Sequence, residues 1–232
     1  MRNFVGYTEN ENFKVGCTGQ TTYVYDKNDN ELANFKKDVL YGYLPIFKPN
    51  SNILVVKSTV GKIAVYDLDS FTLLKKFRFV SVANEGAQDE NMCFSKDGEI
   101  FFNIEKRDGL QTCIAVYNAD NFEQIKVLFE NNENQCLVRI ECDKENGNIY
   151  VLGFMRDDSG VYHQPFVAQL ENEEIINQTN ISHSEYDFLF GYKTLECEGF
   201  TEKSKEWSSL KYDDCDLTNI ENKKFRLADY IK

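Results

Sequence analysis

Two histidines are the first candidates for chemistry in this chain of 232 residues, because imidazole can bind a metal ion or transfer a proton. His163 and His183 stand twenty residues apart. The acids and thiols nearest to them in sequence are Asp157, Asp158, Cys136 and Cys142. Closed zinc sites use paired ligands at short spacing, and the sequence contains no such pair. We therefore expect no metal site and no cofactor.

The segment that begins at Asp26 starts like a calcium-binding loop, with acidic and amide side chains close together. A loop of that class needs glycine at its sixth position and glutamate at its twelfth. Here these positions hold Glu31 and Lys37. The segment is therefore predicted to be a hairpin turn without a bound ion.

Motifs for acyl transfer and phosphate binding are also missing. Ser159-Gly160 lacks the flanking glycine of a Gly-x-Ser-x-Gly elbow, and no Gly-x-Gly-x-x-Gly or Walker-type lysine occurs. Paired carboxylates can cleave glycosidic bonds, and 38 acidic residues leave room for such a pair. The spacing of the acids does not single one out, so no catalytic residue is predicted.

The clearest pattern in the chain is a repeat that ends in an aromatic residue and Asp or Asn. Its copies are Tyr25-Asp26, Tyr66-Asp67, Tyr117-Asn118 and Tyr212-Asp213. Successive copies are 41, 51 and 95 residues apart, and the last interval spans two periods. The missing copy is expected at residues 166–170, where the strand is kept and the aromatic is lost. A period of 40 to 50 residues with several short strands per unit is typical of a β-propeller.

Each unit is predicted to contain four strands joined by tight turns. Asp97-Gly98 and Asn146-Gly147 mark hairpins, because glycine adopts the positive φ that such turns need. The predicted fold is one all-β domain with five four-stranded blades. Unit five is expected to begin with a strand at Tyr186–Phe190, and the chain's last residues to form a short helix or a closing strand. The predicted blades cover residues 3–37, 43–79, 91–130, 137–180 and 185–224, followed by a closing segment at 225–232.

The segment Ile63–Leu74, with its apolar strand, Tyr66-Asp67, polar turn and return strand, resembles the WD40-like and YVTN-like propeller repeats. The chain departs from true WD40 repeats because it lacks their Trp-Asp and Gly-His pairs, and its single tryptophan is Trp207. The resemblance therefore concerns the fold alone. It implies a rigid disc whose loops bind other proteins.

Composition indicates a single compact domain inside the cell. The sequence has no apolar run of 18 residues, and Met1-Arg2-Asn3-Phe4 leads directly into the first predicted strand. We therefore expect a cytoplasmic location. The seven cysteines are odd in number, and Cys17, Cys93 and Cys113 fall inside predicted strands, where cysteine serves as a small buried hydrophobe.

The net charge of −12 is unevenly distributed along the chain. Residues 1–116 carry 14 positive and 15 negative charges, whereas residues 117–232 carry 12 and 23. An acidic field of this kind repels nucleic acid and membrane phosphates and attracts a basic protein. The alternative explanation is that an acidic surface simply keeps the protein soluble.

In a propeller, the turns between second and third strands share one face with the connections between blades. The long polar loops of this chain fall on that face, and binding residues concentrate on such loops. The candidate partner-binding residues are Asp89, Glu90, Asp157, Asp158, Tyr162, His163, Phe200, Glu202, Glu206 and Trp207. Trp207 has an equally good interpretation as a core residue of blade five.

The sequence therefore predicts a non-catalytic protein-binding propeller whose acidic face binds a basic partner. One form of this function is an immunity-type inhibitor that occludes a basic toxin or effector. The first alternative is a glycan-acting hydrolase or lyase with paired carboxylates at the channel mouth. The second alternative is a scaffold subunit of a larger complex. We expect no nucleic-acid partner and no membrane, and a monomer is favoured.

Overall fold

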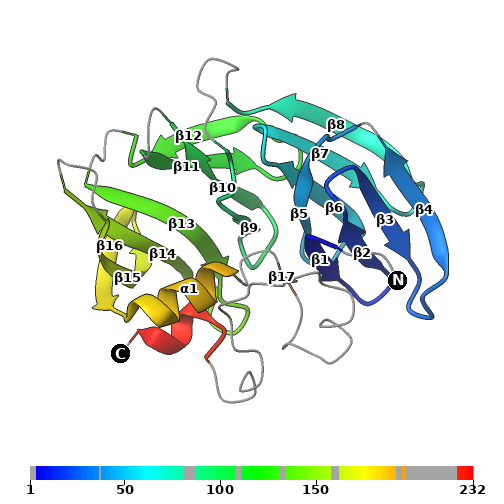
Figure 1. The fold of residues 1–232 in the computed structure, drawn as a ribbon. Coiled ribbons are helices and arrows are strands. Elements are labelled where there is room, and N and C mark those ends of the chain that lie inside the picture. Colours follow the sequence, from blue (N-terminus) through cyan, green and yellow to red (C-terminus); the bar gives the residue numbers. More distant parts are fainter. Residues whose placement is uncertain are drawn as a thin grey trace. The chain divides into compact units, whose positions relative to one another are not determined.

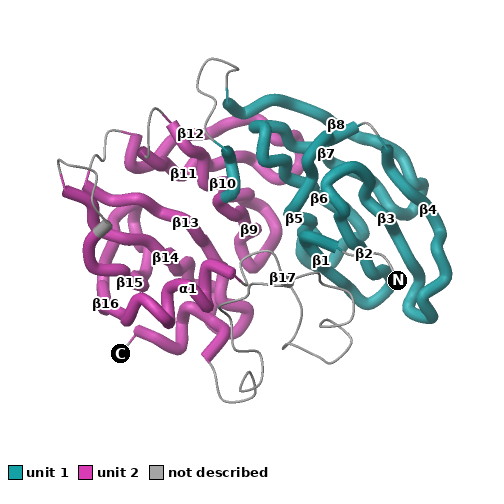
Figure 2. The backbone as a smooth tube through the Cα atoms, in the orientation of Figure 1, with its two compact units in different colours: residues 1–89, 194–212 teal, residues 90–193, 213–232 magenta. Residues whose placement is uncertain are grey.

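The protein is an all-β chain with a single α-helix among the residues that its computed structural model describes (Figure 1). These are residues 4–36, 38–80, 87–107, 111–130, 134–157, 162–191, 195–196 and 224–231. The chain divides into two compact units (Figure 2). Unit 1 comprises residues 1–89 and 194–212, and unit 2 comprises residues 90–193 and 213–232. None of the described helices is long and apolar enough to cross a membrane.

Unit 1 contains two antiparallel sheets whose strands follow one another in sequence order. A short strand, β17, joins the first sheet by pairing in parallel with β1. The core of the unit is built from Val15, Val24, Leu54, Val56 and Tyr66, which are fully or almost fully buried. The strands of unit 1 are β1 (Gly6–Glu9), β2 (Lys14–Cys17), β3 (Thr21–Tyr25), β4 (Glu31–Lys36), β5 (Gly42–Phe47), β6 (Ile53–Ser58), β7 (Lys62–Asp67), β8 (Thr72–Arg78) and β17 (Leu195–Glu196).

Unit 2 also contains two four-stranded antiparallel sheets in sequence order. Ile104, Ile114, Leu137, Val151 and Phe166 form the centre of its core. The elements of unit 2 are β9 (Met92–Phe94), β10 (Ile100–Lys106), β11 (Thr112–Asn118), β12 (Gln124–Leu128), β13 (Gln135–Cys142), β14 (Ile149–Arg156), β15 (Tyr162–Glu171), β16 (Glu174–Asn180), the helix α1 (His183–Gly191) and the 3-10 helix η2 (Leu227–Tyr230).

The burial of the strands follows their place in each sheet. The middle strands are continuous apolar runs, such as β7 and β11, and nearly all of their side chains are buried. Strands that are covered on both faces need apolar residues at every position, which explains why these runs do not alternate. The fourth strands, for example β8, are mostly exposed and mix polar with apolar residues. Each sheet therefore has a buried interior and one solvent-facing edge strand.

The predicted repeat corresponds to the third strand of successive sheets. Tyr25, Tyr66 and Tyr117 stand at the carboxyl ends of β3, β7 and β11, and the degenerate copy with Gln169 lies in β15. The first four predicted units therefore coincide with the four sheets. The fourth copy of the aromatic motif, Tyr212-Asp213, lies outside the described residues.

The acid or amide that follows each of these tyrosines closes the next turn. Asp26 Oδ1 accepts hydrogen bonds from the backbone N–H groups of Asn28 and Asn30 at 2.8 and 2.9 Å. Asp67 and Asn118 accept the equivalent bonds from residues 69 and 120. An Asx side chain that caps its own turn in this way fixes the hairpin locally. The repeated Asp or Asn is thus a turn-forming residue.

The strand predicted at Tyr186–Phe190 is wrong, because these residues belong to helix α1. The helix begins with a capping box. Ser182 Oγ accepts from the Glu185 N–H, and Glu185 Oε2 accepts from the Ser182 N–H at 2.8 Å. These reciprocal bonds satisfy two donors that a helix start leaves unpaired. The start of the fifth predicted blade is therefore helical, and residues 197–223 of that blade lie outside the described part of the chain.

The closing segment adopts the short helix that was one of its two predicted forms. Residues 227–230 form η2, and Leu227 is fully buried. The segment packs against the rest of unit 2, to which it is tied by Arg226 and by the backbone N–H of Leu227.

Candidate functional site

The two sheets of unit 2 present two edges, each of which collects turns from both sheets. The edge formed by residues 95–99, 119–123, 143–148 and 171–174 joins first to second and third to fourth strands, and we call it the turn edge. The opposite edge is formed by the described residues 90–91, 107, 111, 129–130, 134, 156–157 and 162–163, and we call it the loop edge. Of the candidate residues, Glu90, Asp157, Tyr162 and His163 lie on the loop edge, so the two edges can be compared directly.

Only part of the predicted site has described side chains. Asp157 and His163 are exposed, and Asp157 Oδ2 lies 3.0 Å from His163 Nε2. Asp89, at the end of unit 1, is partly buried. Tyr162 begins β15, but its side chain is not described. Five candidate residues lie outside the described part of the chain. They are Asp158, Phe200, Glu202, Glu206 and Trp207.

Glu90 was predicted as an exposed binding residue, and it is instead 2% exposed. Its Oε1 lies 3.7 Å from Lys106 Nζ, beside Cys136. Burial raises the pKa of the Cys136 thiol to about 12, and the carboxylate of Glu90 adds to this shift. A buried acid beside a lysine is a structural ion pair, because it cannot reach a partner across a surface. No pattern in the sequence indicates this burial, since acids are seldom buried.

Glu105 forms a second buried acid at the same edge. It is 0% exposed, and its Oε1 accepts a 2.6 Å hydrogen bond from the hydroxyl of Tyr117. Its Oε2 lies 2.8 Å from Arg107 NH2, and Arg107 Nε donates to Cys113 Sγ at 3.2 Å. Burial of Tyr117, together with the charge of Glu105, raises the pKa of the phenol well above its usual range. This network holds the end of β10 to β11 and explains why the repeated tyrosine is buried here.

Glu141 and Asp143 are the described carboxylates that most resemble a catalytic pair. Burial raises the pKa of Glu141. Burial acts in the same direction on Asp143, but the N–H groups of Asn146 and Glu145 and the Arg226 guanidinium outweigh it and lower its pKa. Carboxylates whose pKa values are pushed apart can serve as acid and base.

The hydrogen bonds of this pair nevertheless assign it a structural role. Glu141 Oε1 accepts from the Leu227 N–H at 3.3 Å, and its Oε2 accepts from Arg139 NH2 at 2.7 Å. Asp143 Oδ1 accepts from the backbone of the next turn, and its Oδ2 accepts from Arg226 at 2.6 Å. All four oxygens are engaged by the protein. The pair therefore anchors the closing segment.

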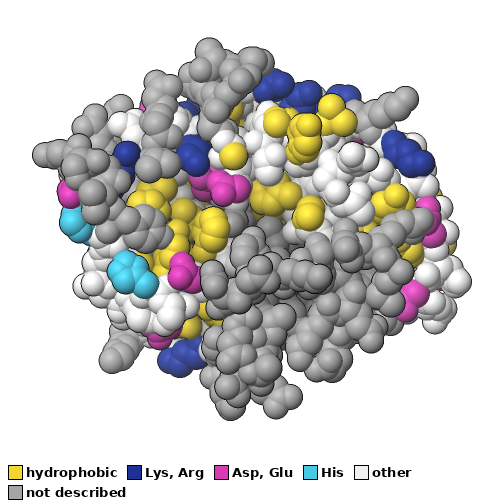
Figure 3. All heavy atoms as spheres, in the orientation of Figure 1, with side chains coloured by type: hydrophobic (Ala, Val, Ile, Leu, Met, Phe, Trp, Pro, Cys, Tyr) yellow, Lys and Arg dark blue, Asp and Glu magenta, His cyan; other side chains and the backbone are white. Residues whose placement is uncertain are grey.

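The exposed carboxylates of unit 2 gather at the turn edge. The described part of unit 2 carries 17 acidic and 9 basic residues, a net charge of −8, whereas the described part of unit 1 carries 10 and 9, a net charge of −1. Figure 3 shows carboxylate side chains on the parts of the visible face that both units form, and histidine side chains on the part that unit 2 forms. The exposed acids of the turn edge are Asp97, Glu99, Asp120, Glu123, Glu145, Glu171, Glu173 and Glu174, and its bases are Lys96, Lys126, Lys144 and Arg226.

Two contacts show that these turns are neighbours in space. Lys96 Nζ donates to the carbonyl oxygen of Glu145 at 2.8 Å, and Lys126 forms an ion pair with Glu173. Glu99, Glu171 and Glu174, in contrast, face no counter-charge among the described residues. The turn edge thus has a surplus of exposed negative charge. On the loop edge, the described exposed acids of unit 2 are Glu130 and Asp157.

The described residues offer no arrangement for metal binding or nucleophilic catalysis. No group of three His, Cys, Asp or Glu side chains among them could hold a metal ion. His163 pairs with Asp157. Cys17, Cys93 and Cys113 are buried in strands, as their positions in the sequence predicted, and Cys136 is buried as well.

Comparison with known proteins does not assign the chain to a family. The chain matches no protein-family model, and no curated protein has significant sequence similarity to it.

Proposed function

We propose that this protein is a non-catalytic, protein-binding β-propeller whose turn edge in unit 2 binds a basic partner protein. The observation that carries the proposal is the surplus of exposed carboxylates at this edge, of which Glu99, Glu171 and Glu174 lack a counter-charge among the described residues. Such a field attracts positively charged proteins and increases their rate of association. An inhibitor that occludes a basic toxin or effector is one protein of this class.

The propeller interpretation is supported by the repetition of one structural unit. Each of the four sheets is a four-stranded antiparallel meander, which is the form of a propeller blade. The third strands end in the same aromatic and Asx motif in three of them. A repeat of this kind buries its faces against its neighbours. The proposal of five blades requires further strands within residues 197–223, which lie outside the described part of the chain.

The proposed binding edge differs from the one that the sequence suggested. The loop edge holds acids that are buried in ion pairs, such as Glu90 and Glu105, and buried charges do not steer a partner. The turn edge holds short hairpins fixed by Asx turns, including that of Asp143. Rigid turns lose little conformational entropy on binding, which favours their use as a recognition surface.

Two variants of equal net charge test this proposal. The first replaces the unpaired acids of the turn edge, as Glu99→Gln, Glu171→Gln and Glu174→Gln. The second replaces three exposed acids elsewhere on unit 2, as Glu130→Gln, Asp157→Asn and Asp187→Asn. Each tagged protein is used to capture partners from an extract of the native host, followed by mass spectrometry.

The expected result is a basic protein that the unmodified chain and the second variant retain and that the first variant loses. Equal capture by both variants would contradict the assignment to the turn edge. Loss with the second variant alone would move the site away from the turn edge, to the surface that carries Glu130, Asp157 or Asp187. Capture of an acidic protein by all three would show that electrostatic attraction does not select the partner.

A further inference from the structure

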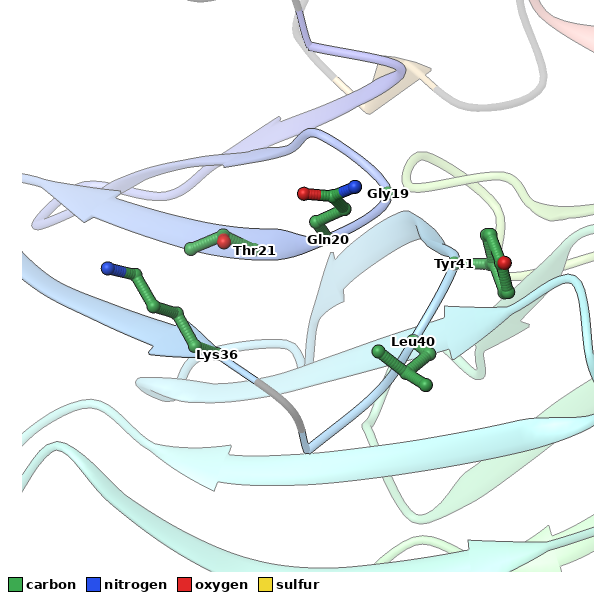
Figure 4. A pocket seen from close by; sticks show the side chains of 6 residues that line it. All are labelled: Gly19, Gln20, Thr21, Lys36, Leu40 and Tyr41. Atoms are coloured by element: carbon green, nitrogen blue, oxygen red, sulfur yellow. The ribbon is translucent and has the colours of Figure 1, made fainter.

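Unit 1 contains an open hollow that the acidic turn edge does not explain. It has a volume of about 300 Å³ and lies where the β2–β3 hairpin meets the end of β4 and the connection to β5. Figure 4 shows Lys36 on one side of the hollow and Leu40 and Tyr41 on the other. The residues that line it are Gly19, Gln20, Thr21, Lys36, Leu40 and Tyr41.

Backbone hydrogen bonds fix the walls of this hollow. The Tyr41 N–H donates to the carbonyl oxygen of Gly19 at 2.6 Å, and the Thr59 N–H donates to that of Tyr41 at 3.1 Å. Ser58 Oγ donates to the carbonyl oxygen of Leu40 at 2.6 Å. The hollow is therefore formed before any ligand arrives, which reduces the entropy lost on binding.

The apolar side chains of the hollow are unusually exposed. Tyr41 is 60% exposed and Leu40 is 50% exposed, although they adjoin in one turn. Tyr41 also has a φ of 59°, a region that bulky residues seldom adopt. Glycine at position 41 would relieve this backbone strain but would remove the aromatic ring of Tyr41. An aromatic residue held outward at an energetic cost offers a flat surface for a second apolar group.

The charge of the lining is positive. Lys36 is the only charged side chain among the residues that line the hollow. No described residue pairs with its ammonium group. The nearest acid in the connecting turn, Asp38, accepts a hydrogen bond from the hydroxyl of Tyr66 at 3.4 Å. The hollow therefore combines one available cation with an aromatic and an aliphatic side chain. This combination complements a carboxylate next to an apolar group.

The position of Lys36 favours a peptide as the source of that carboxylate. Lys36 is the last residue of β4, and β4 is the edge strand of its sheet among the described strands. An extended peptide can pair with an exposed edge and insert one side chain into a pocket at its end. We propose that this hollow binds a linear segment of a partner protein that carries an aromatic side chain beside an acidic residue.

Titration of the labelled protein by NMR with three capped peptides tests this proposal. The probes are Asp-Phe-Asp, Asp-Ala-Asp and Lys-Phe-Lys, each acetylated and amidated, with phenylacetate as a fourth probe. Asp-Phe-Asp is expected to bind in the millimolar range, about 1 mM, with shifts confined to residues 18–21 and 36–42. The other two peptides are expected to bind at least about fivefold more weakly.

Substitutions of the lining residues separate the contribution of the Lys36 cation to peptide binding from that of the Tyr41 ring. Lys36→Gln should weaken binding of Asp-Phe-Asp about threefold or more by removing the cation. Tyr41→Gly should weaken it about fivefold or more, while the fold is kept because glycine accepts a positive φ. Lys76→Gln, which removes an exposed lysine of β8 in the same unit, should leave the affinity unchanged.

Three results would overturn the proposal. The first is an absence of shifts in the hollow up to about 5 mM Asp-Phe-Asp, which is well above the expected affinity. The second is equal binding of all three peptides. The third is binding of phenylacetate as tight as that of Asp-Phe-Asp, which would assign the hollow to a small aromatic acid. None of these results bears on the turn edge of unit 2, because the hollow lies in unit 1 and carries the opposite charge.

Discussion

Arg226 and Asp143 are 83 residues apart in sequence and form an ion pair in which Arg226 NH2 donates to Asp143 Oδ2 at 2.6 Å. Arg226 NH1 also donates to Glu145 at 2.8 Å. The side chain of Asp143 is completely buried, whereas Glu145 is 75% exposed. One guanidinium thus connects the closing segment to the turn that follows β13, through one buried and one exposed carboxylate.

Asp143→Asn is expected to lower the free energy of unfolding at pH 7 by about 1–2 kcal/mol, because a charged hydrogen bond to a buried group is lost. Glu145→Gln, which removes the exposed partner, should cost less than about 0.5 kcal/mol. Urea denaturation of both variants and of the unmodified chain measures the difference. Equal losses of unfolding free energy in the two variants would show that the buried contact stabilises the protein no more than the exposed one.

The same pair predicts a dependence on pH. The folded protein lowers the pKa of Asp143 below its ordinary value of about 3.9, so its contribution to stability is complete above that value. The contribution is lost as the pH falls through the lower, folded pKa. The stability difference between the unmodified chain and Asp143→Asn should therefore be constant from about pH 7 to 5 and shrink below about pH 4. A difference that grows on acidification would contradict this assignment.

Gly6 is expected to tolerate no side chain. A Cβ at this position of β1 would lie 1.7 Å from the carbonyl oxygen of Tyr43 in β5, and backbone cannot move aside cheaply. Gly6→Ala should destabilise the protein by at least about 3 kcal/mol. Gly19→Ala has open space around the added atom and should cost about 1 kcal/mol, owing to its φ of 81°. Thermal unfolding of the two variants provides the comparison.

Local signals made most of the fold predictable from the sequence. The Asx residues after Tyr25, Tyr66 and Tyr117 close their turns within a few residues, so the pattern and the structure share one cause. Ser182 and Glu185 spell a capping box, which is a local signal for helix α1, but the spacing of the repeat favours a strand at these residues.

The candidate site was less predictable, because it depends on contacts between distant segments. Nothing near Glu90 in sequence indicates that Lys106 and Cys136 surround it, so its burial could not be foreseen. The acids at residues 171–174 were visible in the sequence, but their lack of a counter-charge depends on neighbouring turns. The hollow beside Tyr41 arises where two sheets of unit 1 approach, and no motif marks it.

The buried thiols are expected to be unreactive. Burial raises the pKa of Cys17 to about 12, as it does for Cys136, so the reactive thiolate is about a thousandfold scarcer than for an exposed thiol. Iodoacetamide at pH 8 should leave both residues unmodified in the folded protein and alkylate them in urea. Mass spectrometry of the peptides identifies each site. Modification of Cys17 at similar rates in both conditions would show that its strand is open to solvent.

The propeller interpretation predicts the size of the protein in solution. A single compact domain of 232 residues has a radius of gyration of about 17 Å. Small-angle X-ray scattering should give this value with a smooth, single-peaked distance distribution. A radius above about 21 Å with a second maximum would instead describe two separately folded units joined by a tether, and the five-bladed ring would then be wrong.

The central claim is that carboxylates at the turn edge of unit 2 attract a basic protein, and the association rate of the captured partner tests it most directly. Stopped-flow or surface measurements should show that the rate constant falls at least about tenfold between 20 and 300 mM NaCl, while dissociation changes little. The dependence should be markedly weaker for the Glu99→Gln, Glu171→Gln, Glu174→Gln variant. An association rate that is independent of salt, or equally steep in this variant, would contradict the claim.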